Sequence, residues 1–209
     1  AFLTVSDITA NECKFLLGRE PDGITPNGFE NDFVWSGDEY YTKRDEARKA
    51  MITVAEACLG EKFTGDPLIV GTSGRYEFRN KGIDVFIESL KQLAASDRLR
   101  REVLAYITVP AGNRGPRVDL QAHLADPSKP IDGSQYKYST HYLENATWDP
   151  IVNALKNSNL TDPGSKVKVI FVPTYLNKAD GIFNKDYYEL LVGMDITVFP
   201  SYYEPWGYT

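Results

Sequence analysis

Residues 71–82, Gly-Thr-Ser-Gly-Arg-Tyr-Glu-Phe-Arg-Asn-Lys-Gly, constrain the fold of this chain more than any other stretch. They follow the short apolar run 68–70 and precede apolar positions at a helical spacing over 83–94. Strand, glycine-rich turn and helix is the arrangement with which an open α/β sheet binds phosphate groups. The turn contains three cations, Arg75, Arg79 and Lys81. We expect an anion to meet these cations and backbone N–H groups at the helix start.

The rest of the chain repeats this alternation of strands and helices. Apolar, β-branched runs predict further strands at 103–109, 167–172 and 196–199. Helical spacing predicts helices over 42–59 and 150–155, the latter capped by Asp149, and another that begins at 184 or 186. The pattern predicts an α/β, Rossmann-like domain with a mostly parallel sheet and helices on both faces.

Three segments depart from this pattern. Residues 1–17 predict a strand and a short helix, and 29–40 have no clear period and are interpreted as a crossover. Over 113–147, Gly-Pro, Asp-Pro, Lys-Pro and Asp-Gly pairs interrupt a helix expected at 118–124, so we predict a peripheral insertion. The chain begins within a strand and ends just after one, which favours a piece of a longer protein.

Composition excludes several classes of function. The chain has 209 residues, of which 23 are basic and 29 acidic, for a net charge of −6. This balance argues against a general nucleic-acid or anionic-membrane surface. No apolar run approaches the roughly 18–20 residues of a membrane span. Two cysteines 45 positions apart, Cys13 and Cys58, are interpreted as free thiols of a cytoplasmic protein. Two histidines without ligand spacing argue against a metal centre.

By spacing alone, the glycine-rich turn leaves alternatives open. It is neither a Gly-x-Gly-x-x-Gly nor a Walker A sequence, and an ordinary surface loop with solvated cations remains an alternative. Glu204 lies among Tyr202, Tyr203 and Trp206 beyond the last predicted strand. Since ligands gather at the carboxyl ends of parallel strands, Glu204 and the cationic turn are expected to share a crevice. An ordinary loop carboxylate is the alternative reading of Glu204.

Two motifs together resemble one enzyme family. Residues 73–82 and the string Val-Phe-Pro-Ser-Tyr-Tyr-Glu-Pro-Trp-Gly-Tyr-Thr at 198–209 are similar to glycogen synthases of the animal and fungal type. The resemblance covers essentially the whole chain, most weakly at 29–40 and 113–138. It implies a two-lobed glycosyltransferase of the GT-B type, with the end of the acceptor lobe and the crossover in 1–40. Residues 41–209 would then form most of the nucleotide-sugar lobe.

The same resemblance implies a reaction and its residues. Glucose from UDP-glucose, favoured over ADP-glucose, is transferred with retention to the non-reducing end of glycogen or another α-1,4-glucan, without metal or cofactor. Arg75 and Lys81 would hold the donor diphosphate, Glu204 would face the glucose, and Tyr187 would contact the nucleobase. Trp206 and Gly207, next to Glu204, count as substrate-binding residues.

The resemblance also has departures and competitors. The family's second glutamate would fall eight positions after Glu204, beyond Thr209, so we expect the isolated chain to be inactive. The resemblance is also compatible with a homo-oligomer of the full enzyme. The competing readings are another retaining two-lobed enzyme, such as a sucrose or trehalose-phosphate synthase, and a non-catalytic carbohydrate- or nucleotide-binding module.

Overall fold

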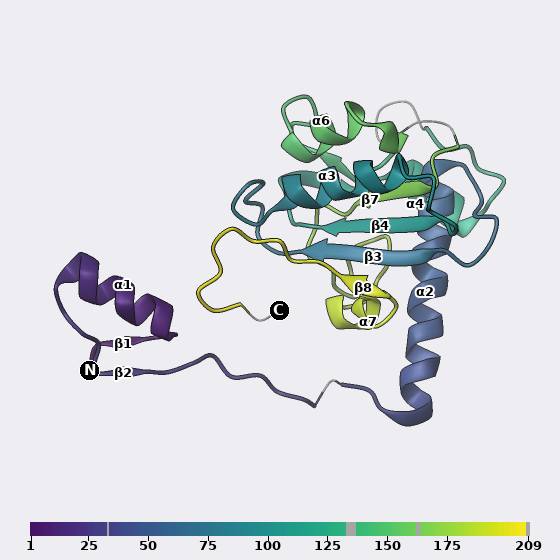
Figure 1. Cartoon of the computed structure of the whole chain (residues 1–209). Helices are drawn as coiled ribbons and strands as arrows, with labels where there is room; N and C mark the ends of the chain where they lie inside the picture. The colour runs from purple at the N-terminus through teal and green to yellow at the C-terminus, as the bar shows by residue number, and fades with distance from the viewer. Residues whose placement is uncertain (33, 133–136, 162–163, 208–209) are drawn as a thin grey trace.

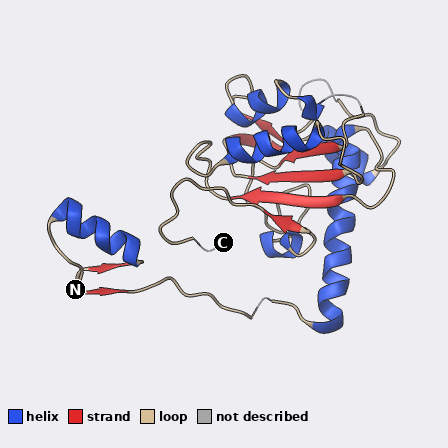
Figure 2. Ribbon diagram, in the orientation of Figure 1, coloured by secondary structure: helices blue, strands red, loops and turns tan. Residues whose placement is uncertain are grey.

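A four-stranded parallel sheet forms the centre of the protein (Figure 2). The structure is a computed structural model that describes residues 1–32, 34–132, 137–161 and 164–207. The strands are β3 (Leu68–Ser73), β4 (Val103–Thr108), β7 (Val167–Phe171) and β8 (Ile196–Thr197), in the order β7-β4-β3-β8. All three pairings are parallel. The predicted α/β class with a mostly parallel sheet is confirmed, although the fourth strand has only two residues.

Helices cover both faces of this sheet, as the alternation of elements predicted (Figure 1). One face packs against α2 (Gly37–Leu59), α4 (Val118–Ala125) and α7 (Tyr187–Leu191). The other packs against α3 (Ile83–Ala94), α6 (Pro150–Lys156) and the 3-10 turn η1 (Asn159–Thr161). Because the strands are covered on both sides, every residue of β4 and β7 is buried, which explains why both strands are apolar or β-branched at every position except Lys168.

Local sequence signals set several helix ends. Gly60 ends α2 in the left-handed conformation, with φ at 70°. Asp149 caps α6 by accepting a hydrogen bond from the N–H of Val152, and Pro150 occupies the first turn. Asp186 and Glu189 form a capping box at α7. None of the helices in the described ranges is both long and apolar enough to cross a membrane.

The segment 113–147 is more regular than its sequence indicates. It contains β5 (Asn113–Pro116) paired antiparallel with β6 (His141–Leu143), and α4 lies between them. The prediction of an interrupted helix at 118–124 was wrong, because the Gly-Pro and Asp-Pro pairs flank α4 instead of breaking it. Leu120 of α4 and Arg117, the residue just before the helix, are fully buried, which anchors this helix to the core. Residues 133–136 of the predicted insertion lie outside the described residues.

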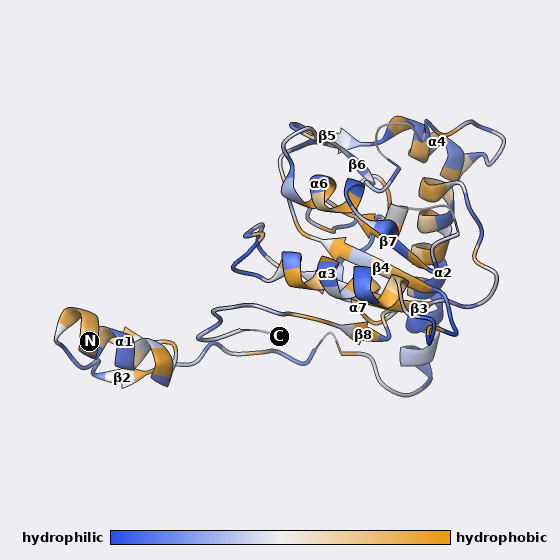
Figure 3. Cartoon of the chain, turned by 45° about the horizontal axis from the view of Figure 1, so that its top comes forward, coloured by the Kyte–Doolittle hydropathy of each residue, from blue (hydrophilic) through white to orange (hydrophobic). Residues whose placement is uncertain are grey.

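The first residues form a small unit that lies apart from the sheet (Figure 1). In it, β1 (Leu3–Thr4) pairs in parallel with β2 (Gly23–Ile24) around α1 (Asp7–Leu17). The expected strand and helix are therefore present. Figure 3 shows α1, with several hydrophobic residues, apart from the sheet domain. None of the residues of α1 is buried, and Phe15 is 82% exposed. The assignment of residues 1–40 to an acceptor lobe and crossover stays a prediction.

Candidate functional site

The carboxyl ends of β3, β4 and β7 meet at one edge of the sheet and line a pocket of about 390 Å³. Parallel strands place the segments that follow them at the same edge, which is where open α/β sheets bind ligands. Ser73 ends β3 and is followed by Gly74 and Arg75, Thr108 ends β4, and 174–176 come after β7. Tyr187, at the start of α7, completes the lining. The predicted crevice therefore has a pocket at its expected place.

A second pocket of about 450 Å³ adjoins the first. Ser73, Gly74 and Tyr187 line both of them. Gly74 has a φ of 141°, and a Cβ built on it would find no atom within 4 Å. Glycine at this position leaves the backbone open to close approach by a ligand. The two pockets thus offer a continuous surface with exposed backbone at its centre.

Tyr187 forms the wall between these pockets. Its phenol lies 2.7 Å from the hydroxyl of Ser73, which holds the ring against the end of β3. Burial raises the pKa of Tyr187 above its ordinary value, although the Ser73 hydrogen bond opposes the shift. The phenol is therefore neutral, and the ring offers a flat, rigid face to a ligand in either pocket.

The cationic turn and the segment that carries Glu204 are fastened together. The N–H of Val198 donates to the carbonyl of Gly71, and that of Tyr202 donates to the carbonyl of Asn80, each at 2.9 Å. The ammonium group of Lys81 lies 2.5 Å from a carboxylate oxygen of Glu204. The two segments are therefore in contact, while their sharing of a ligand-binding crevice stays a prediction.

Gly82 makes this close approach possible. Its φ is 64°, and a Cβ added to it would lie 1.9 Å from the carbonyl oxygen of Pro200. No side chain fits there without displacing the Pro200 backbone. Glycine is thus required at this position by its conformation and by the space available.

The two cations of the site differ in exposure. The Arg75 side chain is 81% exposed and lies 3.6 Å from a carboxylate oxygen of Glu77, whereas the Lys81 side chain is 13% exposed and paired with Glu204. An ammonium group has three donors, so Lys81 can hold Glu204 and still donate to an anion. Arg75 lines the first pocket and is the more accessible cation.

The expected backbone donors at the start of α3 are partly engaged. The N–H of Asp84 donates to the carbonyl of Phe78, and that of Val85 donates to the Asp84 carboxylate. The open backbone at this edge lies at Gly74, just after the end of β3 and well before the start of α3. Binding of an anion at the start of α3 stays a prediction.

Not every predicted site residue lies at the pockets. Trp206 and Gly207 follow Glu204 in the chain but line neither pocket, and Trp206 is 40% exposed. Glu204 and Lys81 lie beside the pockets through their shared loop contacts but do not line them either. The roles of these residues in substrate binding stay predictions.

Sequence reasoning missed Tyr76 and Tyr175. The Tyr76 phenol donates to the carboxylate of Asp149 at 2.6 Å and lines the first pocket, so it ties the cationic turn to the start of α6. Tyr175 lies in the segment after β7 and lines the same pocket. Its position a few residues beyond a predicted strand was the available signal, since such segments meet at the ligand-binding edge.

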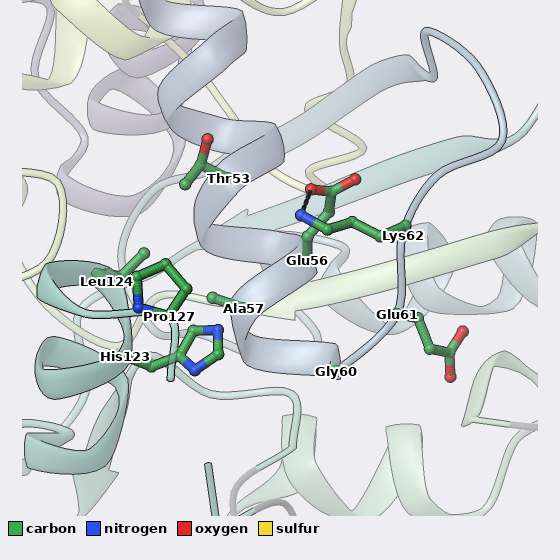
Figure 4. A pocket seen from close by; sticks show the side chains of 9 residues that line it. All are labelled: Thr53, Glu56, Ala57, Gly60, Glu61, Lys62, His123, Leu124 and Pro127. Carbon is green, nitrogen blue, oxygen red and sulfur yellow. Dashed lines mark hydrogen bonds and ion pairs between the residues drawn. The ribbon is translucent and has the colours of Figure 1, made fainter. Parts of the chain in front are cut away.

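A further pocket, of about 300 Å³, lies between the second half of α2 and the end of α4 (Figure 4). The two carboxylates that line this pocket are already paired with lysines. Glu56 pairs with Lys62 at 2.7 Å and accepts from the N–H of Phe63, and Glu61 pairs with Lys168 at 2.5 Å. With its charges paired and no strand end facing it, this pocket is a weaker candidate than the edge of the sheet.

A parallel α/β sheet with a two-part crevice at its carboxyl edge, an aromatic wall and local cations is the arrangement with which open α/β domains bind small ligands. The family model for glycogen synthase matches residues 1–123 and 134–209. The chain therefore belongs to the glycogen synthase family. It is 30% identical to "Glycogen [starch] synthase" of Neurospora crassa and of Caenorhabditis elegans, and 28% identical to "Glycogen [starch] synthase, liver" of Mus musculus.

These matches use the whole of this chain but only part of the relatives. They cover 100% of the chain and 38%, 39% and 37% of the three relatives, respectively. The chain thus spans less than half the length of the relatives it matches. The GT-B arrangement of two lobes stays a prediction.

Proposed function

We propose that this chain supplies the donor site of a glycogen synthase. The reaction is transfer of glucose from a nucleotide sugar, UDP-glucose in preference to ADP-glucose, to the non-reducing end of an α-1,4-glucan such as glycogen, with retention. Family membership and the names of the relatives support this reaction. The observation that carries the proposal is the contact between the cationic turn and the segment of Glu204, beside the crevice at the sheet edge.

The donor diphosphate would lie between the open backbone at Gly74 and the two cations. The Arg75 guanidinium offers paired donors that match phosphate oxygens, and Lys81 would bridge the leaving diphosphate and Glu204. Negative charge grows on the diphosphate as the glycosidic bond breaks. Fixed cations aimed at that charge stabilise the transition state more than the ground state. We propose that these side chains serve in place of a metal ion.

The positions of the nucleobase and the glucose of the donor follow from this placement of the diphosphate. The Tyr187 ring, common to both pockets, offers a stacking face for the nucleobase. Glu204, held by Lys81 and by a 3.3 Å hydrogen bond from Ser201, would face the glucose. Trp206 and Gly207, in the same segment as Glu204, would also contact the sugar.

We also propose a cytoplasmic location. Both cysteines, Cys13 and Cys58, are free thiols. Burial raises the pKa of Cys58 to about 11, which keeps its thiol protonated and unreactive. Unpaired cysteines are usual in a reducing compartment.

The proposed activity is tested in a protein of the relatives' length that contains this segment. UDP-glucose and ADP-glucose compete as donors with glycogen as acceptor, and the products are analysed for lengthened α-1,4 chains. Arg75→Ala and Lys81→Ala should each lower kcat/KM by roughly 30- to 1,000-fold, equivalent to about 2–4 kcal/mol of transition-state stabilisation.

Arg79→Ala is the matched control for this experiment. Arg79 belongs to the same turn and is exposed, but it does not line the first pocket as Arg75 does and is not paired with Glu204 as Lys81 is. Its loss should leave kcat/KM within about threefold of the wild type, as expected for a surface cation. Near-wild-type kcat/KM in both Arg75→Ala and Lys81→Ala would refute the proposal, as would transfer to fructose or glucose 6-phosphate instead of glycogen.

A further inference from the structure

The segment that carries Glu204 is held from two sides. On one side it contacts the cationic turn, through Lys81 and the 2.9 Å hydrogen bond from the N–H of Tyr202 to Asn80. On the other side, the phenol of Tyr203 lies 2.7 and 2.6 Å from the two carboxylate oxygens of Glu12, in the middle of α1. The segment after β8 thus bridges the sheet domain and the N-terminal unit, toward which it extends in Figure 1.

The N-terminal unit is a small body with its own internal contacts. Ser6 caps α1 through a capping box with Thr9, and the β1–β2 pairing closes the unit. The guanidinium of Arg19 lies 4.9 Å from the centre of the Phe2 ring. Because α1 is fixed within this unit, Glu12 moves when the whole unit moves.

The chemistry of the contact favours a defined geometry. A tyrosine phenol is protonated at neutral pH, and the hydrogen bond to Glu12 raises the pKa of Tyr203 further, so the phenol is the donor. A hydrogen bond to a charged acceptor is stronger than one between neutral groups. Tyr203 directly precedes Glu204 in the chain, so its bond to Glu12 restrains the backbone next to Glu204.

We propose that Glu12 is a positioning residue whose hydrogen bond to Tyr203 couples the orientation of the N-terminal unit to the placement of Glu204. This inference rests on the proposed function for its consequence, because Glu204 is the carboxylate assigned to the sugar. When α1 is docked as in this structure, the bond holds Glu204 against Lys81. When the unit turns away, the segment is released on that side. The N-terminal unit thereby controls the sugar end of the site and leaves the nucleotide end unchanged.

Hydrogen–deuterium exchange on the chain tests the coupling without using activity. Glu12→Ala should accelerate amide exchange in residues 201–207 by about three- to tenfold, the scale for loss of one charged hydrogen bond. Tyr203→Phe should in turn accelerate exchange in α1. Glu12→Gln keeps an acceptor oxygen and should give a smaller effect than Glu12→Ala.

Two control variants separate the coupling from local effects. Glu20→Ala removes a nearby carboxylate that pairs with Lys14, and Tyr202→Phe removes the hydroxyl of a ring that is 70% exposed. Both should leave exchange in the opposite segment unchanged. The coupling is refuted if Glu12→Ala leaves residues 201–207 unchanged, or if the controls match the test variants.

Ligand titration of the same variants tests the consequence for the site. Glu12→Ala should leave the affinity for UDP unchanged and weaken binding of UDP-glucose relative to UDP by about three- to tenfold, since only the sugar end depends on Glu204. An equal effect on both ligands, or none on either, would overturn the positioning role. If the wild-type chain binds neither ligand, the proposed function fails, whereas the exchange experiment still decides the coupling.

Discussion

Gly82→Ala should destabilise the protein through one identifiable contact. Alanine in the left-handed conformation costs about 1 kcal/mol. The added Cβ would lie 1.9 Å from the Pro200 oxygen, so the Pro200 segment must retreat by about 1.5 Å to reach the 3.4 Å of ordinary contact. That shift breaks the Tyr202–Asn80 hydrogen bond and weakens the Lys81–Glu204 pair, which together add about 2 kcal/mol. The expected total is about 3 kcal/mol.

Gly60→Ala is a matched control for this substitution. Gly60 has a φ of 70° and a ψ of 22°, close to the 64° and 27° of Gly82, but a Cβ added to it meets no atom within 4 Å. It should cost only the conformational term of about 1 kcal/mol. Urea unfolding, with the slope unchanged, measures both values. If the two variants lose the same free energy of unfolding, the contact between the turn and Pro200 does not hold the site together.

Two other perturbations test separate parts of the structure. Asp195→Asn should lower the free energy of unfolding at pH 7 by about 2 kcal/mol, because the carboxylate accepts from Ile69 and pairs with Arg48 at 2.8 and 2.9 Å. Burial opposes but does not outweigh these contacts, which lower the pKa of Asp195. The stabilisation should be complete above about pH 4 and fade as pH falls through the lowered pKa; an equal difference at pH 2 would contradict this. Tyr187→Ala should weaken UDP binding about tenfold and Tyr187→Phe less than threefold, since the ring supplies the stacking; equal titration results would oppose a stacking role.

The central βαβ unit was predictable because its signals are local. The apolar run before Gly71 and the helical spacing after Gly82 determine β3 and α3 from a few neighbouring residues. The rule that parallel strands end at one edge then brought Glu204 to the cationic turn, although 123 positions separate it from Lys81.

Segment 113–147 was less predictable because its stability depends on distant partners. The Arg117 side chain is fully buried and donates to the Ser139 carbonyl at 3.2 Å and to the sulfur of Cys58, 59 positions earlier, at 3.4 Å. A buried arginine before a short helix has no local sequence signature, because its partners decide whether burial is tolerated. The Glu12–Tyr203 contact is harder still, since it joins two exposed side chains 191 positions apart.

The residues that line the two pockets at the sheet edge were harder to predict from the sequence than the motif residues. Tyr76 and Tyr175 line the crevice because they come shortly after the ends of β3 and β7. A tyrosine at such a position has no sequence signature of its own for ligand binding. By contrast, the phenol of Tyr76 meets Asp149, which the sequence did identify as a helix cap. A cap is predictable from its own helix, whereas its partner in another loop is not.

Calorimetric titration of the chain with UDP tests the central claim most directly, that the turn after β3 forms the phosphate end of a donor site. The wild-type chain should bind UDP, and Arg75→Ala should weaken the affinity by at least tenfold through loss of a paired charge contact to phosphate. Arg79→Ala should bind UDP as the wild type does. Binding that is absent in the wild type, or equal in Arg75→Ala and Arg79→Ala, would contradict the account.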